Sequence, residues 1–205
     1  MQDAQVGSWA RESQLPAEMF ESVRGLNHRF LDLVSIQPDS WSAARRGMSA
    51  EVSAQVAPLS PAQKAAASKC PYALFDLRFH DDCHWRARLQ TAGHWRVAEE
   101  LSVDADILEF VRLALFFAWH VASTTKLAAQ LLLGMHADTA AAFRGATIDC
   151  LPSLAATEAT HLTARWNDCT RYWSALTGAA VQPNSAELRR IQLYGLQLAA
   201  AARLA

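Results

Sequence analysis

The sequence predicts an all-α protein, a multi-helix bundle, on the basis of three observations. Apolar residues recur at three- and four-residue spacings along most of the chain, and helix-start signals precede several of these stretches. Alternating strand patterns are scarce, with 73–79 as an ambiguous candidate. Together these patterns favour helices packed on helices over a sheet-based fold.

The first half of the chain gives two clear helix signals. The stretch 17–36 places its apolar side chains on one helical face: Phe20, Val23, Leu26, Phe30, Leu31 and Val34. Ser60 followed by Pro61 predicts a second start, because a hydroxyl caps the free N–H groups and proline suits the first helical position.

The middle of the chain predicts a buried helix followed by a turn. The stretch 107–120 is apolar nearly all round, so we expect the most buried helix there. Gly134 follows the leucine run 131–133, which is where a left-handed residue ends a helix.

Two further helices complete the expected set. Thr147 is expected to cap a helix over 148–156. Asn184 and Ser185 are expected to begin a last helix over 186–205, which leucine and isoleucine side chains anchor.

Composition and charge limit the class of function. Of 205 residues, 19 are Lys or Arg and 20 are Asp or Glu, so the formal net charge is −1. This balance argues against a protein that coats nucleic acid or anionic lipid by bulk charge. The four cysteines lack close CxxC spacing and the N-terminus lacks an apolar leader, which favours the cytoplasm. The apolar stretch 107–121 is too short and too charged to predict a membrane span.

The sequence also contains a faint internal repeat at an offset of 87 residues. At this offset Gly47 pairs with Gly134 and Arg78 pairs with Arg165. We therefore expect an N-terminal tail over 1–16 and two helical halves over 17–100 and 101–205. The halves are expected to pack on each other around a pseudo-two-fold axis.

The second half resembles the FlhD family, the helical subunit of a flagellar transcription activator. The resemblance rests on the following residues: Lys126, Ala129, Leu133-Gly134-Met135, Ala140, Thr147, Leu154-Ala155, Thr157, Arg165 and Asn167. The first half resembles the same family more faintly, at Gly47-Met48, Glu51, Leu59-Ser60, Gln63 and Leu77-Arg78-Phe79. The chain departs from the family in being about twice its usual length.

The resemblance implies a regulator that works through partners. FlhD-type proteins form homodimers, bind a second subunit called FlhC and contact promoter DNA as that complex. For this chain the resemblance implies an FlhC-like or other protein partner, DNA binding that is weak or depends on that partner, and a possible homo-oligomer.

Two basic stretches are candidates for DNA contact, because arginine and aromatic rings suit phosphates and bases. The candidates are Arg86, Arg88, Arg96, Arg189, Arg190, Gln192 and Tyr194. The alternative is that the arginines form a solvated face. Trp166 and Trp173 are expected to be core or interface anchors.

No motif predicts catalysis, a cofactor or a metal. The segment His80-Asp81-Asp82-Cys83-His84 holds potential ligands, but no second pair of ligands follows at a usual spacing. It is better interpreted as a helix start that Asp81 or Asp82 caps.

These observations favour a non-enzymatic, FlhD-like transcriptional regulator subunit that acts through partner contact and assisted DNA binding. The alternative is a helical scaffold or interaction protein of a bacterial secretion or conjugation system. Neither the charge nor the periodicity separates the two.

Overall fold

The computed structural model describes residues 15–36, 49–91, 104–181 and 185–201. Within these ranges the protein is a bundle of helices with one pair of two-residue strands, so the predicted all-α class is confirmed. Gly47, Arg96, Asn184 and residues 202–205 lie outside the described residues.

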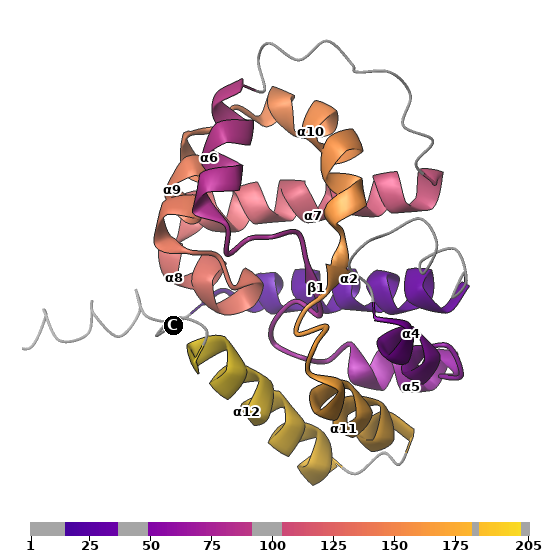
Figure 1. Ribbon diagram of the computed structural model, residues 1–205. Coiled ribbons are helices and arrows are strands. Elements are labelled where there is room, and N and C mark those ends of the chain that lie inside the picture. Colours follow the sequence, from indigo (N-terminus) through magenta and orange to yellow (C-terminus); the bar gives the residue numbers. More distant parts are fainter. Residues whose placement is uncertain (1–14, 37–48, 92–103, 182–184, 202–205) are drawn as a thin grey trace, which may run out of the picture.

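The elements follow one another in this order (Figure 1): α2 Ala17–Ile36, α4 Ala50–Val56, α5 Pro61–Ala67, β1 Phe75–Asp76, α6 Asp82–Thr91, α7 Ala105–Thr124, α8 Lys126–Ala128, η2 Ala129–Leu133, α9 Ala137–Gly145, η3 Ile148–Cys150, α10 Leu151–Glu158, η4 Ala159–His161, β2 Thr163–Ala164, α11 Thr170–Val181 and α12 Ser185–Ala201.

Local signals account for several of these bounds. Helix α2 covers the range that the periodicity predicts. Ser60 and Gln63 cap α5 reciprocally through side chain and backbone, with Pro61 in the first helical position. Gly134 has a φ of 72° and ends the π-helical turn η2, as expected for a left-handed terminator.

The predicted helix over 148–156 is partly wrong. Thr147 makes no side-chain capping bond, and a single 3-10 turn, η3, follows it. The α-helix α10 begins at Leu151 because Pro152, which lacks an N–H, is tolerated in a first turn.

The two halves repeat one backbone pattern. Helices α2 and α7 have 20 residues each and start 88 residues apart. Strands β1 and β2 have the same separation, as do the first residues of α6 and α11. The short helices α4 and α5 of the first half correspond in order to α9 and α10 of the second.

A left-handed residue marks the same place in each half. Arg78 has a φ of 57° and Trp166 a φ of 52°, a region that non-glycine residues enter at a cost of about 1 kcal/mol. This equivalence corrects the sequence-based register, because the backbone pairs Arg78 with Trp166 rather than with Arg165. Small and apolar residues match about equally well at either offset, so the sequence could not separate 87 from 88.

A tryptophan from the following helix holds each of these turns. The indole N–H of Trp85 donates to the carbonyls of Leu77 and Arg78, both at 3.1 Å. The indole N–H of Trp173 donates to the carbonyl of Arg165 at 3.0 Å. Both tryptophans are fully buried, which also confirms the expected core role of Trp173. The bonds therefore fix the direction in which α6 and α11 leave their turns.

That direction carries the helix after each turn, α6 or α11, into the opposite half. Helix α6 packs on α9, and α11 packs on α4 and α5. We call the first group the α7 lobe (α7, α9 and α10 with α6) and the second the α2 lobe (α2, α4 and α5 with α11). Figure 1 shows the α7 lobe above the α2 lobe, with β1 between them.

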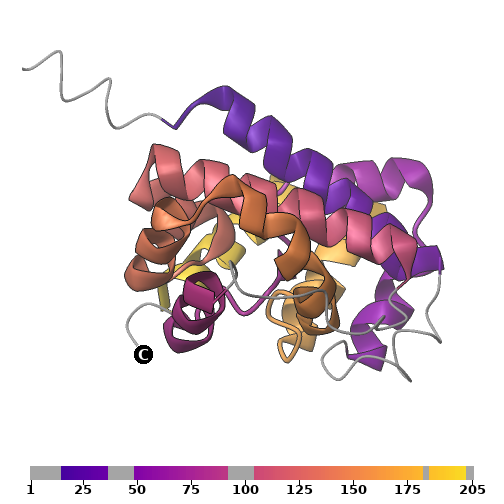
Figure 2. The same ribbon diagram turned by 90° about the horizontal axis from the view of Figure 1, so that it is seen from above.

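The strand pair lies where the two halves cross. Strands β1 and β2 are antiparallel, with Phe75 opposite Ala164 and Asp76 opposite Thr163. This register maps onto itself when the halves are exchanged, so a local two-fold axis passes between the strands. Helices α2 and α7 also pack on each other, and Phe30 contacts Phe110 with ring centroids 6.0 Å apart. Figure 2 shows these two long helices crossing along one face.

Helix α7 is also the one described helix that is long and apolar enough to cross a membrane, by length and composition only. Its apolar residues pack on α2, α9 and α10, and a core helix of this kind meets the same criteria.

Asn27 organises the approach to β1 from inside the core. Its amide donates to the carbonyl of Tyr72 at 2.8 Å and accepts from the N–H of Leu74 at 2.8 Å. Because Asn27 is fully buried, water cannot replace these bonds.

We expect Asn27→Ala to lower the free energy of unfolding by about 3 kcal/mol, since it leaves buried backbone groups unpaired. Gln192→Ala is the matched control: it removes one bond at the surface, to the carbonyl of Lys69, and should cost less than about 1 kcal/mol. Equilibrium urea denaturation measures both, and equal losses would contradict the role given to Asn27.

The two turn-holding tryptophans should be equally important. Trp85→Phe and Trp173→Phe should each lower the free energy of unfolding by about 2 kcal/mol. Each substitution leaves a buried carbonyl without its hydrogen-bond donor and creates a small cavity. Trp119→Phe removes a similar bond, to the carbonyl of Ala146, at a partly buried site and should cost less. A small effect at Trp85 or Trp173 would show that the turns are held by other contacts.

Candidate functional site

The structure separates the two predicted basic stretches. Arg86 and Arg88 lie on α6, whereas Arg189, Arg190, Gln192 and Tyr194 lie on α12. Figure 1 shows α6 and α12 at opposite ends of the molecule. The two stretches therefore do not form one continuous surface.

The arginines of α6 are engaged with carboxylates. Arg86 lies 3.1 Å from Asp82 and 3.5 Å from Asp138, at a half-exposed position. The Nε of Arg88 lies 3.2 Å from Oε1 of Glu158, whose side chain is 0% exposed. Arg88 thus points towards the interior of the α7 lobe.

Of the four candidate residues on α12, the two arginines are exposed and the other two are partly buried. Arg189 is exposed, and Arg190 is 79% exposed and 3.2 Å from Glu187 on the same helix. Gln192 and Tyr194 instead attach α12 to the α2 lobe, through the carbonyl of Lys69 and the ring of Tyr172.

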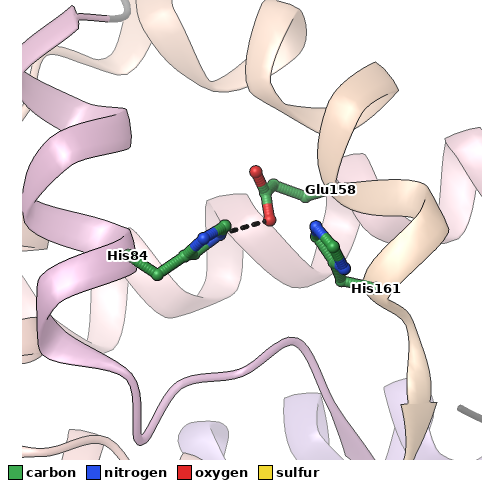
Figure 3. A group of neighbouring side chains, drawn as sticks. All are labelled: His84, Glu158 and His161. Atoms are coloured by element: carbon green, nitrogen blue, oxygen red, sulfur yellow. Dashed lines mark hydrogen bonds and ion pairs between the residues drawn. The ribbon is translucent and has the colours of Figure 1, made fainter.

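Glu158 lies at the centre of a cluster that sequence spacing did not reveal. Its Oε2 is 2.8 Å from Nε2 of His84, and an imidazole nitrogen of His161 is within 4.8 Å of both. Figure 3 shows the carboxylate between the two imidazole rings. His84 comes from the first turn of α6, while Glu158 and His161 come from the end of α10 and from η4.

The start of α6 fixes the position of His84 in the cluster. Oδ1 of Asp81 accepts a bond from the backbone N–H of His84 at 2.9 Å, so the predicted capping of α6 is confirmed. This bond lowers the pKa of the Asp81 carboxyl. His80, in contrast, is exposed and pairs with Asp76 at 3.5 Å, away from the cluster.

The electrostatics of the cluster depend on burial. Burial lowers the pKa of the His161 imidazole, against the opposing effect of the Glu158 carboxylate. Oε1 of Glu158 is in an ion pair with Arg88, yet no hydrogen bond among the described residues reaches it. The arrangement holds one buried carboxylate beside two imidazoles and one guanidinium.

A different set of side chains occupies the equivalent place in the α2 lobe. At the 88-residue offset, Cys70 corresponds to Glu158 and Tyr172 to His84. The thiol of Cys70 lies 3.8 Å from the Tyr172 hydroxyl, which in turn is 3.1 Å from that of Tyr72. Burial raises the pKa of the Cys70 thiol to about 11. The same pair of backbone positions therefore carries neutral hydroxyl and thiol groups in the α2 lobe and ionisable, potentially metal-binding groups in the α7 lobe.

Helix α12 makes a second difference between the two lobes. It packs over Tyr72 and Tyr172 so closely that a Cβ at Gly195 would lie 1.9 Å from the Tyr72 hydroxyl. The first half has no counterpart of α12 among the described residues, because α7 already begins at Ala105. No described helix therefore takes the corresponding place over His84 and Glu158.

A cavity of about 440 Å³ lies beside the strand pair. Residues of both halves line it, including Asp76, His80, His136, Arg165 and Asp168. The guanidinium of Arg165 stacks 4.6 Å from the Trp166 ring at its wall. The cavity thus lies near the internal axis and is distinct from the Glu158 cluster.

No family model, curated protein or solved structure matches the chain. The structure itself defines an all-α protein of two intertwined halves, in which α6 of the first half packs in the α7 lobe and α11 of the second half packs in the α2 lobe.

The ion pair between Arg88 and the buried Glu158 should matter far more to stability than those of Arg86. We expect Arg88→Met to lower the free energy of unfolding by about 3 kcal/mol, because it leaves a buried carboxylate without its cation. Arg86→Met, the matched control on the same helix, should change it by less than about 1 kcal/mol. Urea denaturation of both variants measures the difference, and similar values would contradict the burial argument.

Proposed function

We propose that this chain is an FlhD-like regulatory subunit that works by binding a protein partner and by assisting that partner on DNA. The observation that carries the proposal is the exchange of α6 and α11 between the halves. A family whose members act as homodimers presents one patch twice, around a two-fold axis. A single chain with two intertwined halves provides the same kind of scaffold without a second copy.

The asymmetry of the halves supports a specialised partner surface. Helix α12 covers the α2 lobe and carries the solvent-facing Arg189 and Arg190. A homodimer would present such a helix twice, whereas the described residues of this chain present it once. We therefore expect one partner and one DNA-facing edge for each chain.

The charge balance supports DNA binding that depends on a partner. With a formal net charge of −1, the chain supplies little bulk attraction for a polyanion. Arg189 and Arg190 can each neutralise one phosphate, while a more basic partner would supply the remaining affinity. The isolated chain should bind DNA poorly.

The test pairs the chain with an FlhC-like protein encoded beside it. The complex should bind promoter DNA, and Arg189→Ala with Arg190→Ala should weaken binding at all sequences alike. The slope of log affinity against log salt should decrease in magnitude by about one to two. Fluorescence anisotropy over a salt series measures both effects.

Arg112→Ala with Arg144→Ala is the matched control, because both arginines are exposed and lie away from α12. Unchanged DNA binding by the Arg189/Arg190 double variant would contradict the role given to α12. A chain that binds components of a secretion apparatus, and no FlhC-like partner, would favour the scaffold alternative instead.

A further inference from the structure

The His84, Glu158 and His161 cluster has the composition of a metal site. Two imidazole nitrogens and one carboxylate oxygen lie within 4.8 Å of one another, on segments from different halves of the chain. Glu158 ends α10 and His161 ends the following turn η4, three residues later, so one stretch of chain presents both. His84 faces them from α6, with its Nε2 directed at the carboxylate.

The ligand types select the class of metal. Calcium and magnesium prefer sites built from oxygen ligands, and two imidazoles do not suit them. Two histidines and one glutamate match the three-ligand sets that hold zinc with a fourth position left for water. We propose that His84, Glu158 and His161 form a three-ligand site for a divalent first-row transition metal, with Zn²⁺ as its occupant.

The surroundings of Glu158 match those of a ligating carboxylate. Its Oε2 faces the imidazoles, while its Oε1 faces the guanidinium of Arg88 at 3.2 Å. Outer contacts of this kind orient a ligating carboxylate and are a regular part of metal sites. Zn²⁺ would replace the contact between His84 and Oε2 and leave the contact with Arg88 in place.

The same contacts allow the protein to fold without the metal. The charges of Glu158 and Arg88 balance, and His84 occupies the second carboxylate oxygen. Binding should therefore be reversible, unlike that of small zinc domains which unfold when the metal is removed.

The equivalent position in the α2 lobe has the same backbone arrangement without metal ligands. Cys70 and Tyr172 replace Glu158 and His84 there, and α12 packs over the neighbouring Tyr72. The α7 lobe has ligand groups in this frame, and His84 retains 12% exposure. A bound ion would tie α6 of the first half to α10 and η4 of the second.

The experiment uses the full chain, stripped with EDTA and dialysed against zinc chloride. Elemental analysis should give about one zinc per chain, and the melting temperature should rise with zinc concentration. Co²⁺ in place of Zn²⁺ should give the visible d–d absorption bands of a four-coordinate site, with water as the fourth ligand. Circular dichroism should show the same helix content with and without metal.

His161→Ala is the principal variant because His161 is partly exposed and its loss should leave the fold intact. It should weaken zinc binding by more than about 100-fold, beyond the effect of losing an outer contact. His80→Ala is the matched control, since His80 is an exposed histidine outside the cluster. Glu158→Gln and His84→Ala should weaken binding in the same way wherever circular dichroism shows them folded.

Two results would overturn the proposal. One is less than about a tenth of an equivalent of zinc retained by the wild-type chain after dialysis. The other is an equal loss of zinc in His80→Ala and His161→Ala, which would show surface binding to scattered histidines. Neither result bears on partner or DNA binding, so the regulatory proposal is tested separately.

Discussion

The architecture depends on two buried hydrogen bonds of one kind, each from an indole N–H to a carbonyl eight residues earlier. They hold Arg78 and Trp166 in left-handed turns that neither residue type favours. Each turn aims the following helix away from its own half, so α6 reaches α9 and α11 reaches α4 and α5. The core, the strand pair and the Glu158 cluster all depend on that crossing.

The two halves differ most at the positions where α6 and α11 pack, and in the presence of α12. The backbone places α6 and α11 alike, yet one frame holds Cys70 and Tyr172 while the other holds Glu158 and His84. Helix α12 exists on one side alone among the described residues. Cys70, Tyr172 and Glu158 are buried and His84 is 12% exposed, so each lobe packs its own chemistry against the same arrangement of helices.

Sequence patterns predicted the local structure well and the long-range structure poorly. Apolar periodicity gave the bounds of α2, Ser60 with Pro61 gave the start of α5, and Gly134 gave the end of η2. The exchange of helices was not predictable, because a left-handed arginine carries no sequence signal of its own. The Glu158 cluster was missed for a related reason: His84 and Glu158 are far apart in sequence, and only the crossing of the halves brings them together. The short spacing between Glu158 and His161 was the one local signal.

The exchange of α11 also has a consequence for the order in which the chain can fold. Helices α4 and α5 are synthesised early, but the helix that completes their lobe begins only at Thr170. Contacts between residues so distant in sequence carry a large loop-closure cost and slow the folding of a helical protein. The apolar faces of α2, α4 and α5 therefore stay open on the ribosome until the second half has been made, which makes the nascent first half a natural substrate for chaperones.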